Sequence, residues 1–243
     1  MSSQHPASCP PSGVCQSGCR QELFDTLAQV GRALGNGNRL ELLERLAQTE
    51  AAVEVLAQAS GISVANASQH LQHLRRAGLV TTRREGRQVL YRLTDTRIIT
   101  LMTLMREIAE THLAEVERLV GKLFAEDDAG GALEPMSRDT LQTALDAGEV
   151  TVLDVRPEQE YQAGHLPSAI NVPIEKLEQM LDLLPPEQEI VAYCRGPYCV
   201  LSHEAVQILR RKGFRVRRYE EGYPEWKAAG LPVDEARSHR ADT

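Results

Sequence analysis

The feature that most constrains the fold is an apolar run that leads directly into a short cysteine-bearing loop and then into a helical pattern. The run EIVAYC, residues 189–194, has the length and apolar content of a buried strand, and apolar residues recur at helical spacing from Val200 onward. We expect Cys194 to lie at the carboxyl end of this strand, facing the amides of a tight loop and a helix N-terminus. Because such an environment stabilises a thiolate, the sequence predicts a reactive sulfur at Cys194.

The C-terminal half continues this pattern, with strand-like and helix-like segments in alternation. Alternating strands and helices are typical of a parallel sheet that is covered on both faces. We therefore expect an α/β domain with strands over residues 150–155, 168–172, 189–194 and 214–219, and with helices over residues 139–147, 174–183 and 200–212.

The N-terminal half is instead dominated by helical periodicity. Ser63 precedes one helical pattern and Gly78 follows it, so they are predicted to cap and to stop a helix, and Asn38 is predicted to cap an earlier one. Residues 79–94 contain two β-rich arms around Glu85-Gly86, the pattern of a hairpin. Helices followed by a hairpin predict an all-α-rich winged helix-turn-helix domain, with helices over residues 21–34, from residue 38, and over residues 52–59, 63–77 and 95–124.

Composition changes along the chain predict its domain boundaries. Residues 1–19 are rich in Ser, Pro, Gly and Cys and are expected to form a flexible tail, and the acids, paired glycines and proline of residues 126–135 are expected to form a linker. The 243 residues then contain a DNA-binding and dimerisation domain over residues 20–125, a second domain over residues 136–233 and a short tail over residues 234–243.

The sequence has no predicted membrane or export segment. No apolar run approaches the roughly 18 residues that span a bilayer, and the N-terminus lacks the apolar core of a signal peptide. We therefore expect a cytoplasmic protein without a membrane partner. Thiols in the cytoplasm stay reduced unless they are catalytic or sensing, so the five cysteines do not predict a structural disulfide framework.

Charge is distributed unevenly, and the basic part coincides with the predicted helix-turn-helix. The whole chain has a net charge of −7, but residues 63–92 contain six arginines and one glutamate. In a winged helix-turn-helix the second helix of the motif enters the major groove and the wing contacts the DNA backbone, so we expect double-stranded operator DNA as a partner. The candidates on the outward face of that helix are Ser63, Asn66, Ser68, Gln69, His70 and His73, and the candidates for phosphate contacts are Arg75, Arg83, Arg84 and Arg87.

The run ASQHLQHLRRAGLVTTRREGRQVLYRL resembles the recognition helix and wing of the ArsR/SmtB repressor family, and the resemblance covers about residues 20–124. It implies a homodimer that uses the first and last helices of the domain, and a repressor that an inducer releases. The broad apolar stripe expected on the last helix agrees with a partner chain as its cover.

The metal sites usual in that family do not carry over to this chain, because the helix before the recognition helix has no cysteine. We therefore expect no metal at those positions. Cys9, Cys15 and Cys19 form a separate group of thiols that could bind a soft metal or metalloid, could be oxidised by polysulfide, or could belong to a tail without a sensing function.

Three segments of the C-terminal half, VTVLDVRPEQEYQAGHLPSAINVP, EIVAYCRGPYC and YEEGYPEWKAAGLPV, together resemble a single rhodanese domain over about residues 135–233. The resemblance implies that Cys194 is the sulfur-accepting nucleophile and cycles between thiolate and persulfide. Arg195 is expected to add positive charge for an anionic donor such as thiosulfate. Asp154, Arg156 and Glu160 are expected to form a supporting polar network beneath the loop, and no cofactor is expected.

The loop after Cys194 continues with Gly196, Pro197, Tyr198 and Cys199. Pro197 removes one potential amide donor. Cys199 adds a second thiol, which could resolve a Cys194 persulfide into a disulfide or could be a small buried hydrophobe. Because no arginine closes the loop after Cys199, a phosphoryl or arsenate dianion lacks its bidentate clamp, and phosphatase or arsenate reductase chemistry is excluded.

The sequence therefore supports three functional hypotheses. The leading one is a dimeric DNA-binding transcriptional regulator, a repressor, in which sulfane sulfur accepted by Cys194 alters operator binding. The second is a sulfurtransferase that acts on thiosulfate or a persulfide and has an accessory DNA-binding domain. The third is a metalloid-responsive repressor that uses Cys9, Cys15 and Cys19.

Overall fold

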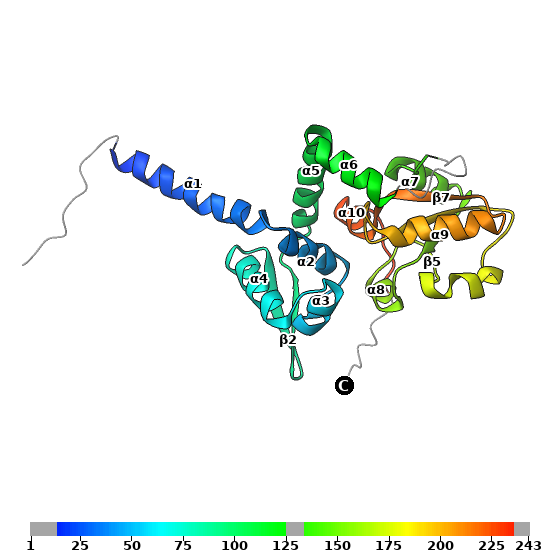
Figure 1. The fold of residues 1–243 in the computed structure, drawn as a ribbon, viewed down its shortest axis with the longest axis horizontal. Helices are drawn as coiled ribbons and strands as arrows, with labels where there is room; N and C mark the ends of the chain where they lie inside the picture. Colours follow the sequence, from blue (N-terminus) through cyan, green and yellow to red (C-terminus); the bar gives the residue numbers. More distant parts are fainter. Residues whose placement is uncertain (1–13, 125–133, 236–243) are drawn as a thin grey trace, which may run out of the picture.

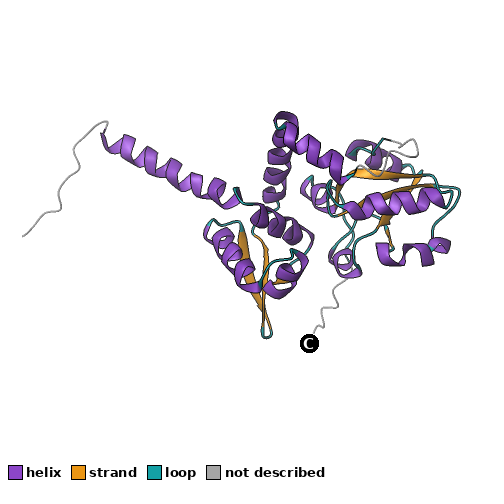
Figure 2. Ribbon diagram, in the orientation of Figure 1, coloured by secondary structure: helices purple, strands orange, loops and turns teal. Residues whose placement is uncertain are grey.

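The computed structural model describes residues 14–124 and 134–235, in which two domains each contain a separate β-sheet (Figure 1). Figure 2 shows that helices surround a small sheet in the N-terminal domain and a larger one in the C-terminal domain. The predicted order, a winged helix-turn-helix followed by an α/β domain with a parallel sheet, is confirmed. The N-terminal elements are α1 Val14–Leu34, α2 Gly37–Gln48, β1 Ala51–Ala52, α3 Val53–Ala59, α4 Val64–Arg76, β2 Val80–Glu85, β3 Gln88–Leu93, α5 Arg97–His112 and α6 Ala114–Leu123.

Short polar residues cap the helices of the helix-turn-helix. The Ser63 hydroxyl accepts a hydrogen bond from the Asn66 amide at the start of α4, as predicted. The cap of α2 differs from the prediction, because Asn36 rather than Asn38 has the extended backbone conformation, and its side chain accepts from the Arg39 amide. The helix begins at Gly37, so Asn38 already lies inside its first turn.

The hairpin β2–β3, called the wing below, forms as the sequence predicts. Its strands are antiparallel, Glu85 pairs with Gln88, and the turn between them places Gly86 at a φ of 58°. The wing packs onto β1 to give the sheet order β1-β3-β2. The core beneath it consists mainly of leucines, including Leu42, Leu43, Leu46, Leu56, Leu71 and Leu74.

The last helical segment of the N-terminal domain is interrupted, although the sequence predicts one helix over residues 95–124. Helix α5 ends at His112, Leu113 adopts an extended conformation with φ −115° and ψ 96°, and α6 starts at Ala114. Glu115 lies in the first turn of α6, where a negative charge interacts favourably with the helix dipole. The prediction is wrong here because apolar periodicity continues across a break of one residue.

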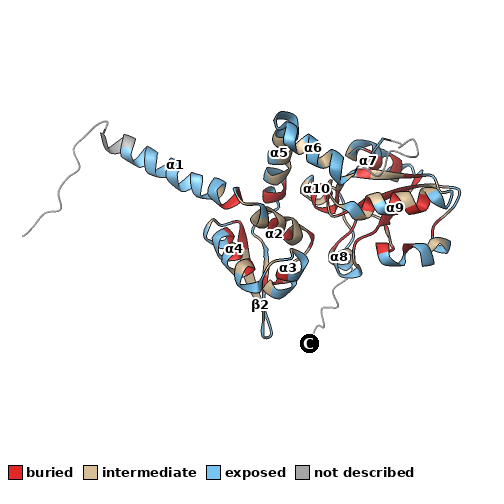
Figure 3. Ribbon diagram, in the orientation of Figure 1, coloured by how far each residue is buried: buried red, intermediate tan, exposed pale blue. Residues whose placement is uncertain are grey.

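Two N-terminal helices expose large apolar side chains. Helix α1 extends away from the rest of the domain and is exposed along most of its length (Figure 3). Leu23 and Leu27 on α1 are 56% and 57% exposed, and Leu104 and Ile108 on α5 are 51% and 63% exposed. Exposed apolar surface of this extent is typical of a surface that another chain covers.

The C-terminal domain is built on four parallel strands in the order β5-β4-β6-β7. Alternate residues of β6 face opposite sides of the sheet. Cys194 belongs to the apolar cluster with α9 and η2, whereas Tyr193 belongs to the cluster with α7 and α10. The expected coverage of both faces is therefore confirmed. The elements are α7 Arg138–Asp146, β4 Val150–Asp154, α8 Glu158–Ala163, β5 Ile170–Asn171, η2 Ile174–Gln179, η3 Leu181–Leu183, β6 Glu189–Cys194, α9 Val200–Arg211, β7 Val216–Gly222 and α10 Tyr223–Ala228.

Several local predictions differ from the structure. The helix predicted over residues 174–183 consists of two 3-10 helices, η2 and η3. The predicted flexible tail over residues 1–19 overlaps α1, which begins at Val14 and includes Cys15 and Cys19, whereas Cys9 lies outside the described residues. Asp234, predicted to lie in a tail, pairs with His165 in an isolated bridge. Within the described ranges no helix is both long and apolar enough to cross a membrane.

Candidate functional site

The central strand β6 ends at Cys194, and the loop that follows is the centre of the candidate site. Cys194 is completely buried, and the amide of Cys199 donates to the Gly196 carbonyl to close the loop. Helix α9 starts at Val200, with Cys199 as its N-cap residue. The strand, the loop and the helix therefore follow one another in the order that the sequence predicts.

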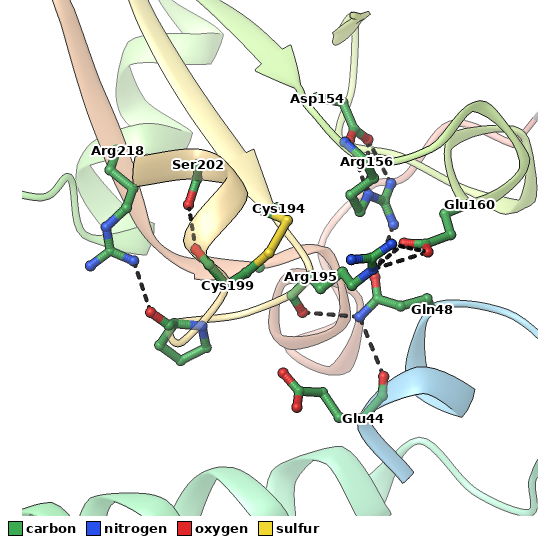
Figure 4. Close-up of a disulfide and its surroundings, with 12 residues drawn as sticks. Glu44, Gln48, Asp154, Arg156, Glu160, Cys194, Arg195, Cys199, Ser202 and Arg218 are labelled. Atoms are coloured by element: carbon green, nitrogen blue, oxygen red, sulfur yellow. Dashed lines mark hydrogen bonds and ion pairs between the residues drawn. A yellow bond between two sulfur atoms is a disulfide. The ribbon is translucent and has the colours of Figure 1, made fainter. Parts of the chain in front are cut away.

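The two loop cysteines form a disulfide (Figure 4). Their Cα atoms are 6.2 Å apart, within the range that a disulfide spans. Cys194 lies in the apolar cluster beside α9 and is completely buried. The expectation that amides converge on the Cys194 thiolate stays a prediction, because the structure contains the oxidised form, in which Cys199, not Cys194, is the N-cap residue of α9.

A glycine at the end of β7 holds the loop closely. A Cβ atom on Gly222 would lie 2.5 Å from the Arg195 carbonyl carbon and 2.5 Å from the Gly196 nitrogen. Because no real side chain fits such distances, β7 approaches the loop this closely through a residue without a Cβ. Nothing in the local sequence pattern marks Gly222 for this role.

The Arg195 side chain is paired with a carboxylate, which the sequence does not predict. Its guanidinium makes a bidentate ion pair with Glu160, with Nε 2.9 Å and 3.0 Å from the two carboxylate oxygens and Nη2 2.7 Å from Oε1. Both side chains are mostly buried. Because Glu160 already neutralises Arg195, this arginine adds no uncompensated positive charge for an anionic donor.

Asp154 and Arg156 form a fully buried ion pair next to that one. Arg156 donates to the Asp154 carboxylate from Nε and Nη2, and to the Gly164 carbonyl at 2.7 Å. The Tyr193 hydroxyl also donates to Asp154. Burial, and then the charge of Asp154, raises the pKa of Tyr193 well above its usual value, so this hydroxyl remains a donor. The structure thus brings Asp154, Arg156, Glu160 and Arg195 together beside the loop.

Gln48 connects this network to the N-terminal domain, and sequence reasoning did not identify it. It is buried at the end of α2, and its Nε2 donates to the Arg195 carbonyl at 2.9 Å. Its Oε1 accepts from Arg156 at 3.1 Å. One amide side chain of the helix-turn-helix therefore contacts both the cysteine loop and the buried ion pair (Figure 4).

Helix α5 provides a second connection between the domains. The Tyr198 hydroxyl donates to Glu110 of α5 at 2.5 Å, and Arg106 of α5 pairs with the buried Glu225 of α10 at 3.3 Å. Burial raises the pKa of Glu225, although Arg106 opposes the shift. The cysteine loop is therefore held between α2 and α5 of the N-terminal domain.

The residues predicted to contact DNA differ in their exposure to solvent and in whether another residue already binds them. Ser63, Gln69, His73, Arg75, Arg84 and Arg87 are exposed, and Asn66 and Ser68 are half-buried. His70 faces Asn38 of α2 at 3.4 Å and is not on the outward face; burial, and then the charge of Arg39, lowers its pKa. Arg83 forms an ion pair with Glu50, so its charge is not free.

Similarity to known proteins covers both domains. A model of the rhodanese-like domain matches residues 137–229, and a model of a helix-turn-helix domain matches residues 34–83. The HTH-type transcriptional regulator Rv0324 of Mycobacterium tuberculosis is 46% identical over 220 residues, which are 90% of this chain and 95% of that protein.

Two further relatives each match one domain. A protein named sulfurtransferase from Allochromatium vinosum is 28% identical over 98 residues, which are 40% of this chain and 90% of that protein. The putative arsenical resistance operon repressor ArsR2 of Halobacterium salinarum is 40% identical over 100 residues, which are 40% of this chain and 81% of that protein.

Proposed function

The chain belongs to the ArsR family of HTH-type transcriptional regulators and carries a C-terminal rhodanese-like domain, and from this premise we propose that it is a repressor controlled by sulfane sulfur. Cys194 accepts the sulfur, and the redox state of Cys194 and Cys199 sets the affinity of the winged helix-turn-helix for operator DNA. The single observation that carries the proposal is the direct contact between the cysteine loop and α2 through Gln48.

The chemistry requires both cysteines. In the reduced protein the Cys194 thiolate attacks the outer sulfur of a persulfide RSSH; the S–S bond of the donor breaks, and RS⁻ leaves with the electron pair. The Cys199 thiolate then attacks Sγ of the Cys194 persulfide, the disulfide forms, and HS⁻ leaves. The sulfane sulfur is reduced by two electrons and the two thiols are oxidised by two.

Coupling to DNA requires that the two redox states differ in their contacts with the N-terminal domain. Closing the disulfide constrains residues 194–199, and this segment contains the carbonyl that Gln48 binds and the hydroxyl that Glu110 binds. Release of this constraint on reduction changes the loop where α2 and α5 contact it.

The N-terminal domain acts as a homodimer in this proposal. The exposed apolar side chains of α1 and α5, including Leu23, Leu27, Leu104 and Ile108, support a partner chain as their cover. In each protomer α4 enters the major groove, where the exposed Gln69 reads base edges, and Arg84 and Arg87 of the wing contact phosphates.

Operator titration at defined redox states tests the proposal. Operator affinity is measured by fluorescence anisotropy for reduced protein, for protein treated with polysulfide, and for Cys194→Ser, with mass spectrometry of both cysteines on the same samples. We expect the affinity to change on treatment in the wild-type protein and in Cys19→Ser, a control for the exposed thiol of α1, and not in Cys194→Ser. Equal affinity for all forms would disprove the coupling.

A further inference from the structure

A pocket of about 270 Å³ lies at the mouth of the disulfide, and both domains line it. Small-molecule sites occur frequently at domain interfaces, and Cys199 of the disulfide is one of the residues that line this pocket. Its lining consists of Glu41, Glu44 and Arg45 from α2, Arg195, Tyr198 and Cys199 from the loop, and the first two residues of α9.

In the disulfide form the two cysteines differ in their access to this pocket. Cys199 lines it and is half-buried, whereas Cys194 is completely buried and does not line it. In thiol–disulfide exchange the attacking thiolate must reach the sulfur that it bonds to. A small thiol in the pocket therefore reaches Cys199, and Cys194 is the leaving sulfur.

Two carboxylates, Glu41 and Glu44, and two guanidinium groups, Arg45 and Arg195, line the pocket. Arg45 pairs with Glu41 at 3.6 Å, and Arg195 pairs with Glu160. Glu44 lines the same pocket, and the two arginines whose charges act on it are the ones already paired with Glu41 and Glu160. A Cβ on Gly196 would lie 3.6 Å from the Glu44 carboxylate, so this carboxylate faces the loop directly.

The environment of Glu44 is unfavourable for further negative charge. Burial raises the pKa of Glu44, and the charge of Glu225, which also faces Gly196, raises it further, while Arg45 and Arg195 oppose the shift. An anionic solute that enters the pocket is repelled by the Glu44 carboxylate, whereas a cation is attracted.

We propose that this pocket is the exchange site of the disulfide, that Cys199 is the sulfur attacked there, and that Glu44 selects uncharged or cationic low-molecular-weight thiols over anionic ones. The proposal rests on the proposed function in one respect, since both require that Cys194 and Cys199 cycle between disulfide and dithiol. It adds the chemical class of the reductant and assigns a residue of the helix-turn-helix to its selection.

The exchange proceeds in two balanced steps. A thiolate RS⁻ attacks Sγ of Cys199, the bond to Cys194 breaks, and the electron pair goes to Cys194, which leaves as a thiolate. A second RS⁻ attacks the outer sulfur of the mixed disulfide at Cys199, releasing RSSR and the Cys199 thiolate. The two small thiols are oxidised and the protein disulfide is reduced by two electrons.

Three thiols of similar size test the charge selection on the oxidised full chain. The probes are 2-aminoethanethiol, a cation, 2-mercaptoethanol, which is uncharged, and 2-mercaptoethanesulfonate, an anion. The rate of disulfide opening by each thiol is divided by the concentration of its thiolate form, because the three thiols differ in pKa. At low ionic strength we expect the cation to be fastest and the anion slowest, with a span of roughly tenfold. Equal rates for the three would overturn the proposal.

A matched pair of variants tests the role of Glu44. In Glu44→Gln the ratio of cation to anion rates is expected to fall to less than half of the wild-type ratio. In Glu22→Gln, which removes the same charge from the exposed α1, the ratio is expected to remain unchanged. An unchanged ratio of cation to anion rates in Glu44→Gln would contradict the role of Glu44 in selecting the thiol. If Glu44→Gln does not fold, the wild-type protein still tests the charge selection, because added salt must bring the rates for the cation and the anion together.

The attacked sulfur is identified by mass spectrometry after an acid quench. Trypsin cleaves between Arg195 and Gly196 and separates the two cysteines into different peptides. We expect the first mixed disulfide on the peptide of Cys199; an adduct on the peptide of Cys194 would overturn the assignment.

Operator affinity measured on the same samples separates this proposal from the proposed function. Charge-selective opening without any change in operator affinity would contradict the sensor and leave the exchange site standing. A redox-dependent affinity with unselective opening would contradict the exchange site alone. If Cys194 and Cys199 form no disulfide under any of these conditions, both the exchange site and the proposed function are contradicted.

Discussion

Two arginine–carboxylate pairs occur in contrasting regions of the molecule. In the wing, Arg83 donates to Glu50 at 2.8 Å, and the two side chains are 38% and 28% exposed. Beneath the cysteine loop, Arg156 donates to Asp154 at 2.6 Å, and both side chains are completely buried. The hydrogen-bond geometry is similar, but water can replace either partner in the wing and neither partner beneath the loop.

This difference indicates what each region is suited to do. A half-exposed pair contributes little to stability, so the wing can exchange partners when a phosphate approaches. A buried pair cannot separate without leaving an uncompensated charge in the core. The buried pair therefore fixes the surroundings of the loop, and Gln48 transmits the position of the loop to α2.

The largest expected effect comes from breaking the buried pair. Asp154→Asn leaves the Arg156 charge without its counter-ion, and we expect a loss of about 3–5 kcal/mol in the free energy of unfolding. Glu50→Gln makes the same chemical change in the partner of Arg83 and is expected to cost several-fold less. Urea unfolding of both variants measures the contrast, which is refuted if the two losses are equal.

A smaller effect is expected from crowding the loop. In Gly222→Ala the new methyl group meets the backbone of Arg195 and Gly196 and must displace it, at a cost of about 1–3 kcal/mol. Gly31→Ala is the matched control, because a Cβ on this residue of α1 would meet nothing within 4 Å. There the same change is expected to stabilise the helix by about 0.5–1 kcal/mol. Thermal unfolding compares the two, and a stabilised Gly222→Ala would show that β7 does not confine the loop.

These two glycines illustrate how far the sequence alone can predict this molecule. Local patterns predict the wing, the cap at Ser63 and the strand, loop and helix around Cys194, because each depends on neighbouring residues. The close approach at Gly222 depends on the sheet register and leaves no local signal.

The contacts between the domains are even less accessible to sequence reasoning. Gln48 and Arg195 are 147 positions apart, and a glutamine on a helix is ordinarily a solvent-exposed residue. Charge alone also does not reveal the partners of Arg195, Arg83 and His70, because Glu160, Glu50 and Asn38 come from other elements. The break at Leu113 is likewise invisible to apolar periodicity.

An intermediate effect is expected at the contact between the two regions. Gln48→Ala leaves the Arg195 carbonyl and one Arg156 nitrogen without their partner, which costs about 1–3 kcal/mol. We also expect the operator affinities of the oxidised and reduced protein to converge, since the loop loses its contact with α2. Gln58→Ala, at an exposed position of α3, is the control for both measurements. If Gln48→Ala unfolds more easily but keeps the full redox dependence of affinity, Gln48 is a structural residue and the coupling uses α5.

The smallest effect is expected within the wing, where Arg83 and Arg84 are adjacent but differ in partner. Arg84 is exposed on the wing, whereas Arg83 is paired with Glu50. The logarithm of the DNA affinity falls linearly with the logarithm of the salt concentration, and removing a phosphate contact lowers the steepness of this line by about one unit. We expect Arg84→Ala to lose that unit for every DNA sequence and Arg83→Ala to lose less, because Glu50 already neutralises part of its charge. Operator titrations over a range of KCl concentrations measure both slopes. An equal decrease in slope for both variants would mean that Arg83 leaves Glu50 and binds a phosphate when the protein binds DNA. The ion pair of Arg83 with Glu50 would then break on DNA binding.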